Sequence, residues 1–182
     1  MKVGFIGLGN VGAKLAGSVL RNGFDLTVRD LDSSATEEFS RLGTHVARSP
    51  KELAERCDVI ITCLPSPTIS ASVMEDENGV LARLSEGNIW IEMSTTDEQE
   101  VLRIAEKVHA QGAFTADCPV SGGCHRAATG NIAIFAGCDR TVFESVFPLL
   151  AAMGRQVLHT GPLGTASILK VVTNYLLSLI HI

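Results

Sequence analysis

The sequence VGFIGLGNVG, residues Val3 to Gly12, decides the fold expected for this chain. Its apolar start predicts a strand, and a Gly-Leu-Gly-Asn-Val-Gly pattern follows where a helix is expected to begin. In such a unit the first glycine permits a tight turn, the second lets the backbone approach a pyrophosphate, and the third lets the helix pack on the strand. The loop residues expected at the phosphates are Gly7, Leu8, Gly9, Asn10, Val11 and Gly12.

An acidic residue beyond this loop strengthens the interpretation. Asp30 lies 18 positions after Gly12, at the end of the second predicted strand. A carboxylate there can accept hydrogen bonds from the 2′- and 3′-hydroxyls of an adenosine ribose. Because it would also repel a 2′-phosphate, the sequence predicts NAD as cofactor, in preference to NADP. An ordinary βα turn is the alternative interpretation of the glycines.

The composition narrows the class of protein. The chain has 182 residues, 46% hydrophobic and 19% charged, so it can bury a substantial core. Its net charge of −5, without a basic block, argues against a nucleic-acid partner. The terminal stretch Val171–Ile182 has twelve residues, short of the roughly 20 that span a bilayer, so no membrane span is expected. No secretory segment precedes the first strand and no Cys-x-x-Cys pair occurs, so we expect a cytoplasmic protein without a metal site.

Short apolar runs alternate with helical patterns, which is typical of a doubly wound, mostly parallel α/β sheet. The clearest helix is expected over Glu98–His109, with Thr96 and Gln99 forming a capping box at its start. Further helices are expected over Arg140–Met153 and from about Ala166. The strands expected are Lys2–Ile6, Asp25–Arg29, His45–Val46, Asp58–Thr62, Ile89–Glu92, Ala113–Ala116, Asn131–Ala136 and Gln156–His159.

Two more loops follow predicted strands, at the edge where open α/β sheets bind their ligands. Leu64 and Pro65 come after the fourth strand, although a proline is also a common strand end. Thr95 follows the fifth strand and can reach the part of a cofactor near the nicotinamide ribose. The neighbouring Thr96 is expected to cap the next helix.

A third loop and the last helix carry the groups that suit a substrate. Ser121, Gly122 and Gly123 can present a hydroxyl and consecutive backbone N–H groups to a carboxylate, or form a plain glycine-rich loop. Lys170 and Asn174 lie four residues apart and share one face of an otherwise apolar helix. Desolvation favours the neutral form of such a lysine, which suits a general acid/base. A surface lysine with its charge in water is the alternative.

Together, five collinear motifs resemble the β-hydroxyacid dehydrogenase family, which includes 3-hydroxyisobutyrate dehydrogenase and tartronate semialdehyde reductase. The motifs are residues 7–12, 64–65, 93–95, 117–123 and 161–174. The resemblance implies a Rossmann-type NAD-binding domain over residues 1–162, followed at 163–182 by the first helix of an all-helical domain. It also implies that the chain is a truncated form with little activity, and that the full-length protein is a homo-oligomer.

The same resemblance implies a reaction and a role for each group. Hydride would pass between the nicotinamide and the alcohol carbon of a small 3-hydroxy acid, without a metal. Lys170 would be the general acid/base and Asn174 would orient the substrate. The loop at 121–123 would bind the substrate carboxylate, and Leu64, Pro65 and Thr95 would contact the cofactor. The chain departs from the family pattern at Arg126, where glycine is usual, and at Ala166 and Thr173.

Other functions remain open on the sequence. One is an NAD-binding module without catalysis. Another is an α/β scaffold that oligomerises through its last helix, which a collapsed glycine loop would support. The third is an imine reductase or another carbonyl reductase on the same scaffold, but those relatives tend to lack the lysine.

Overall fold

The computed structural model describes residues 1–180, in which strands and helices alternate along most of the chain. The strands are β1 (Lys2–Ile6), β2 (Asp25–Arg29), β3 (His45–Val46), β4 (Val59–Thr62), β5 (Ile89–Glu92), β6 (Phe114–Asp117), β7 (Val120–Ser121), β8 (Ile132–Gly137) and β9 (Gly154–Gly161). The helices are α1 (Gly12–Arg21), α2 (Ser33–Arg41), α3 (Pro50–Arg56), α4 (Pro67–Glu75), α5 (Glu98–His109), α6 (Gly123–Ala128), α7 (Arg140–Met153) and α8 (Thr165–Ile180), with a 3₁₀ turn, η1, at Val80–Ala82.

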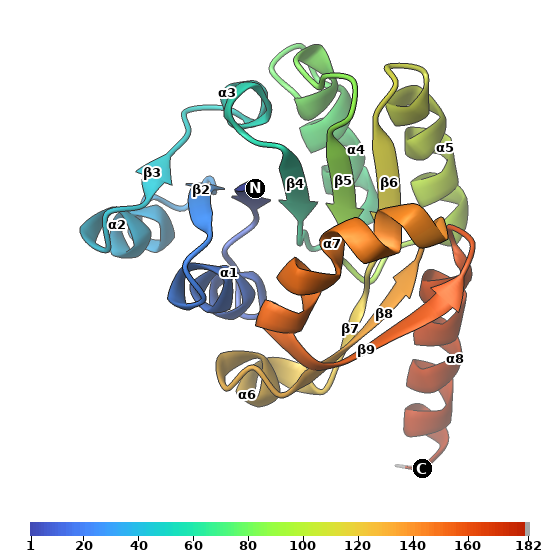
Figure 1. Cartoon of the computed structure of the whole chain (residues 1–182). Helices are drawn as coiled ribbons and strands as arrows, with labels where there is room; N and C mark the ends of the chain where they lie inside the picture. The colour runs from blue at the N-terminus through green and yellow to red at the C-terminus, as the bar shows by residue number, and fades with distance from the viewer. Residues whose placement is uncertain (181–182) are drawn as a thin grey trace.

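The strands form one sheet in the order β3-β2-β1-β4-β5-β6-β8-β7, and β9 pairs with β8 (Figure 1). Strands β1 to β6 run parallel to one another, whereas β8 runs antiparallel to β6 and β7 and parallel to β9. The expected doubly wound, mostly parallel sheet is therefore confirmed. The reversal of strand order beside β1 is the place where folds of this kind bind their ligands.

Each face of the sheet has its own core, because successive strand residues point to opposite sides. Ile89 and Ile91 of β5 pack in the core that also holds residues of α1, α6 and α7. Trp90, between them, packs in the other core with residues of α3, α4 and α5. Helices thus cover both faces, and ligands can approach mainly at the strand ends.

The predicted elements agree with the structure to within a few residues, with one wrong detail at the start of α5. Asp97, not Thr96, is the capping residue, since its carboxylate accepts the Gln99 N–H at 2.9 Å. Thr96 is buried instead. Strand β9 is longer than the predicted 156–159, because it pairs along most of β8.

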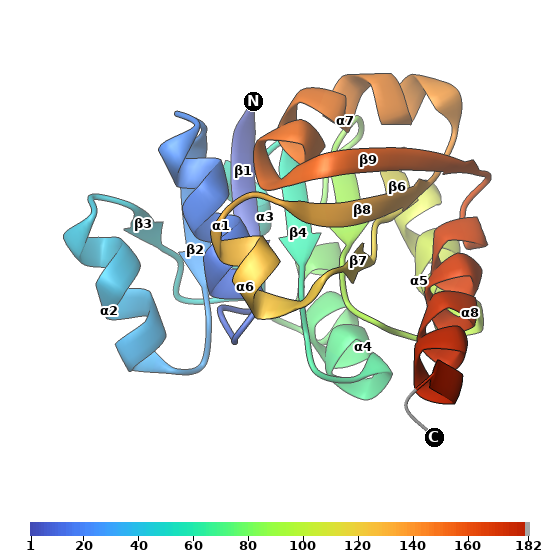
Figure 2. The same ribbon diagram turned by 90° about the horizontal axis from the view of Figure 1, so that it is seen from below.

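The last helix lies at the opposite end of the sheet from β3 (Figures 1 and 2). Figure 1 shows α8 extending on the side to which the arrowheads of β4 and β5 point. Its contacts in the sheet are with β8, β9 and β6. The helix therefore extends on the side of the sheet where the glycine loop follows β1, which is parallel to β4. Within residues 1–180, no helix is both long and apolar enough to cross a membrane.

Candidate active site

The glycine loop packs closely against neighbouring backbone at Gly7 and Gly12, and it is open at Gly9. Gly7 has φ of 99°, and a Cβ there would lie 2.3 Å from the Cys63 carbonyl oxygen. A Cβ on Gly12 would lie 2.0 Å from the Gly7 carbonyl oxygen. By contrast, a Cβ on Gly9 would meet nothing within 4 Å. The space before Gly9 lets a ligand approach the backbone closely. The loop is not collapsed, so the scaffold hypothesis does not gain the support that a collapsed loop would have given it.

The amino end of α1 is available to an anion. Its capping residue, Val11, makes no side-chain hydrogen bond to the helix. The first helical hydrogen bond is donated by Ala13 to the Gly9 carbonyl. The N–H groups that precede Ala13 therefore take no part in the hydrogen bonds of the helix. These N–H groups and the positive end of the helix dipole attract phosphate. Together with the space at Gly9, this end of α1 fits the diphosphate of a dinucleotide.

Asp30 is attached directly to this loop, a contact that sequence reasoning did not foresee. Its Oδ2 accepts the Leu8 N–H at 2.5 Å, and its Oδ1 accepts the Asp32 N–H at 2.9 Å. Each carboxylate oxygen can accept a second hydrogen bond. The carboxylate is thus held beside the glycine loop with acceptor capacity left for sugar hydroxyls.

The loops after β4 and β5 are joined by hydrogen bonds. The Leu64 N–H donates to Ser94 Oγ at 2.7 Å, and the Ser94 N–H donates to Glu92 Oε1 at 2.8 Å. Glu92 is buried, with 1% of its surface exposed, and this burial raises the pKa of its carboxyl group. Pro65 and Thr95 are exposed on the same two loops.

Ser94 lies in the predicted motif 93–95, but its buried partner Glu92 was not among the predicted site residues. The signal was an acidic residue at the end of the apolar strand Ile-Trp-Ile-Glu, where a buried charge needs a partner.

The predicted substrate loop begins in β7, where Ser121 pairs with Ala133 of β8. Gly122 and Gly123 have φ of 132° and 76°, a region that favours glycine, so these two residues are needed for the shape of the loop. Arg126 lies against the first glycine, because a Cβ on Gly122 would be 2.9 Å from Arg126 Cδ. The departure from the family pattern at this position therefore borders the loop itself.

Lys170 is buried on α8, with 9% of its surface exposed, and desolvation lowers the pKa of its amine. The desolvation of the Lys170 amine that the sequence predicts is thus seen in the structure. Asn174, one turn later, is exposed. The structure links α8 to the loop at 121–123 through β8, which pairs with β7 and contacts α8. The substrate-binding and catalytic roles of these residues stay predictions.

Among the predicted site residues, Leu64 and Asp30 both lie against the glycine loop that begins at Gly7. A Cβ on Gly7 would lie 3.1 Å from Leu64 Cδ2, and the Asp30 bond to Leu8 closes the other side of the loop. Within residues 1–180, His, Cys, Asp and Glu side chains form no group of three that could hold a metal ion.

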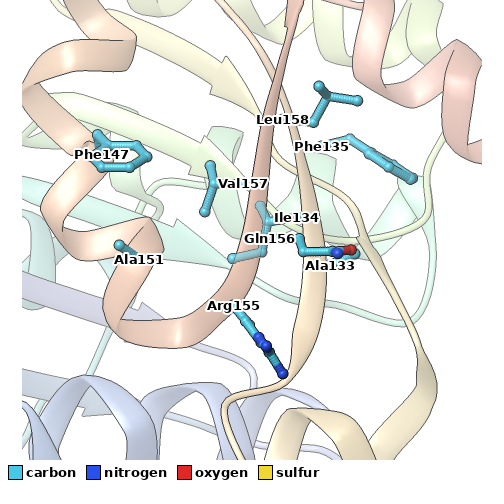
Figure 3. A pocket seen from close by; sticks show the side chains of 10 residues that line it. Ala133, Ile134, Phe135, Phe147, Ala151, Arg155, Gln156, Val157 and Leu158 are labelled. Atoms are coloured by element: carbon cyan, nitrogen blue, oxygen red, sulfur yellow. The ribbon is translucent and has the colours of Figure 1, made fainter.

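A separate hollow lies away from these loops. It has a volume of about 570 Å³ and is formed by residues of β8, β9 and α7, among them Phe147, Val157 and Leu158 (Figure 3). None of the predicted site residues lines it.

The fold and the open glycine loop define a dinucleotide-binding α/β domain, and comparison with known proteins gives its family. The sequence profile of the NAD-binding domain of 6-phosphogluconate dehydrogenase matches residues 2–161, and the chain belongs to this family. The NAD cofactor expected from the glycine loop is confirmed.

The chain is also similar to several dehydrogenases. It is 37% identical over 177 residues to mitochondrial 3-hydroxyisobutyrate dehydrogenase of Rattus norvegicus, covering 97% of this chain and 53% of that protein. It is 35% identical over 181 residues to NAD-dependent L-serine dehydrogenase of Pseudomonas aeruginosa, covering 100% of this chain and 61% of that protein.

The fold is similar to solved structures of the same group. A structure of Mycobacterium tuberculosis 3-hydroxyisobutyrate dehydrogenase with L-serine superposes with a TM-score of 0.91 and 28% identity, covering 97% of this chain and 60% of that one. The resemblance expected from the five motifs is therefore confirmed. The chain spans about half to three fifths of the length of the relatives it matches.

Proposed function

We propose that this chain supplies the NAD-binding and acid/base groups of a dehydrogenase that acts on small 3-hydroxy acids. The observation that carries the proposal is a buried lysine of lowered pKa, Lys170, on a helix that extends from the ligand-binding edge of an NAD-binding sheet. The similarity to 3-hydroxyisobutyrate and L-serine dehydrogenases supports it. The substrates named for these relatives each carry a carboxylate and a hydroxyl on the third carbon.

The residues of this chain divide the work of holding the cofactor. The N–H groups at residues 9–12 and the dipole of α1 would hold the diphosphate, and Asp30 would accept hydrogen bonds from the adenosine ribose. Leu64, Pro65 and Thr95 would line the path toward the nicotinamide. When bound, NAD supplies the acceptor for the hydride that leaves the alcohol carbon.

Lys170 would handle the proton of the same reaction. In oxidation its neutral Nζ accepts the hydroxyl proton as the carbonyl forms, and in reduction the ammonium returns a proton to the carbonyl oxygen. Ser121 Oγ and the N–H groups of Gly122 and Gly123 would bind the substrate carboxylate. Asn174, one turn beyond the lysine, would orient the hydroxyl.

The test of the lysine is a panel of small 3-hydroxy acids, including L-serine and 3-hydroxyisobutyrate, assayed with NAD under single-turnover conditions. We expect Lys170→Ala to lower the rate at saturating substrate by about 100-fold or more. Because burial lowers the pKa of Lys170 below its ordinary 10.5, the wild-type oxidation rate should rise with pH below that value, and the variant should lose this rise. Lys51→Ala, on α3, is the matched control. A fall of less than tenfold would remove Lys170 from the mechanism, and NAD binding without turnover of any acid would favour a binding module.

The cofactor preference is tested at Asp30. Asp30→Ala removes the ribose acceptor and the charge that repels a 2′-phosphate, so NAD affinity should fall at least tenfold while NADP affinity rises. Titration calorimetry with both nucleotides measures the ratio of the two Kd values. An unchanged ratio would contradict the role given to this carboxylate.

A further inference from the structure

A buried carboxylate at the end of β6 is joined to the start of α8. Asp117 has no exposed surface, and its two oxygens accept one backbone N–H from the residue that precedes α8 and one from the first turn of α8. Oδ1 accepts from Gly164 at 2.9 Å, and Oδ2 accepts from Ser167 at 2.7 Å. Burial raises the pKa of Asp117, while these two N–H donors oppose that rise. A carboxylate at the amino end of a helix is also favoured by the helix dipole.

The third member of this junction is Gly137 in β8. It is the register partner of Asp117, and a Cβ there would lie 2.3 Å from Asp117 Oδ1. The same Cβ would be 3.0 Å from the Pro162 carbonyl oxygen and 3.1 Å from the Ala166 nitrogen. Gly137 does not have a positive φ, so glycine is not needed here for the backbone conformation. It is needed because a side chain would occupy the space of the Asp117 carboxylate. It leaves room for the carboxylate to reach the helix.

We propose that Asp117 is a positioning residue that fixes Lys170 relative to the loop at 121–123. The inference rests on the proposed function, which makes Lys170 the acid/base. Asp117 lies four residues before Ser121, and its bonded partner Ser167 lies three residues before Lys170. One side chain therefore anchors both the strand that leads into the substrate loop and the helix that carries the lysine.

The anchoring acts through the helix and not through charge on the lysine. Desolvation is the cause of the lowered pKa of Lys170, and Asp117 is not among its causes. Residues three apart on a helix are neighbours on its surface, so movement of the first turn moves the lysine with it. A helix that separates from β6 would admit water to Nζ and restore the ordinary pKa.

The test uses Asp117→Asn, which keeps the size of the side chain but leaves only one acceptor for two N–H groups. Amide exchange at Gly164 and Ser167 should become about tenfold faster or more. The titration of Lys170, followed by its ¹³Cε resonance in the chain without cofactor, should move upward toward 10.5. Asp32→Asn is the matched control, since Asp32 caps α2 by accepting the Ser34 N–H at 2.8 Å and α2 lies at the other end of the sheet.

Gly137→Ala is the second variant, and it carries the test if the first does not unfold cooperatively. It keeps the carboxylate but displaces it from the helix, and it should raise the pKa of Lys170 in the same direction. In turnover, both variants should lower kcat by about tenfold or more while leaving the Kd for NAD unchanged, since the glycine loop is untouched.

An unchanged Lys170 pKa in a folded variant whose Gly164 and Ser167 amides exchange faster would overturn the proposal, because Asp117 would then be a helix cap alone. This outcome is separate from failure of the proposed function. If Lys170→Ala keeps its turnover, the catalytic role falls, whereas the effect of Asp117 on the Lys170 pKa is measured without any reaction.

Discussion

Glu92 shows how a single buried carboxyl group can organise a ligand edge at a cost in stability. Its Oε1 holds the Ser94 N–H, but within residues 1–180 its Oε2 has no hydrogen-bond partner, and neither has Ser70 Oγ beside it. Burial raises the pKa of Glu92 above its ordinary 4.5. A raised pKa means that its contribution to stability is full below 4.5 and is lost as the pH rises through the folded value.

Glu92→Gln should therefore stabilise the domain at neutral and alkaline pH. The carboxamide keeps an acceptor for Ser94 and offers an N–H to Ser70, without a buried charge. We expect the variant to be more stable than the wild type at pH 8, with the difference shrinking toward pH 4.5. Urea unfolding at both pH values measures it, with Glu106→Gln on the exposed face of α5 as control. A variant whose loss of stability grows from pH 4.5 to pH 8 would show instead that the folded protein prefers the charged form of Glu92.

At the scale of elements, an ion-pair cluster connects α4 to α5. Both carboxylate oxygens of Glu75 accept from Arg103, at 2.7 and 2.6 Å, and Lys107 also donates to Glu75. Arg103 donates in turn to Glu100. The Arg103 guanidinium, followed by Lys107, lowers the pKa of Glu75 to about 2. Helices α4 and α5, two of the helices that cover this face of the sheet, are therefore joined by ion pairs at the surface as well as by contacts in the core.

The contribution of this cluster should disappear in acid. A lowered carboxyl pKa gives stability that is present above the ordinary value of 4.5 and is lost as the pH falls through about 2. Glu75→Gln should thus be less stable than the wild type at pH 7, and the difference should close as the pH falls through about 2. Thermal unfolding across this range measures the difference. Glu37→Gln is the control, because Glu37 pairs with Arg41 of its own helix. Equal stability of Glu75→Gln and wild type at pH 7 would show that the cluster is only a surface contact.

Elements were also the scale at which sequence reasoning was most successful. The bounds of α5 and of the first two strands follow from periodicity and turn residues, because these signals are local. The contact between Asp117 and Ser167 joins residues 50 positions apart, and no local pattern encodes such a contact. The same applies to the bond between Asp30 and Leu8. The sequence allowed polar and charged residues to be placed at the strand ends. It did not show which of these residues are hydrogen-bonded to each other or to distant parts of the backbone.

At the scale of the whole molecule, NAD should stabilise the domain by mass action. Substitution of two glycines of the loop should distinguish a glycine needed for folding, Gly12, from one needed for NAD binding, Gly9. Gly12→Ala places a Cβ 2.0 Å from the Gly7 carbonyl oxygen, so unfolding should become easier by about 1–3 kcal/mol. Gly9→Ala meets nothing within 4 Å and needs no positive φ, so the free chain should keep its stability or gain about 0.4–1 kcal/mol.

Saturating NAD should reverse the order of Gly9→Ala and the wild type in stability. At NAD concentrations near 100 times Kd, the wild type gains about 2.7 kcal/mol against unfolding. Gly9→Ala fills the space that a diphosphate would use, and a tenfold loss of affinity reduces the gain by about 1.4 kcal/mol at high NAD. Thermal unfolding of the wild type and of Gly9→Ala, with and without NAD, measures how much NAD stabilises each of them. If Gly9→Ala is stabilised by NAD as much as the wild type is, the open space before Gly9 does not hold the cofactor, and the diphosphate must bind elsewhere on the edge of the sheet.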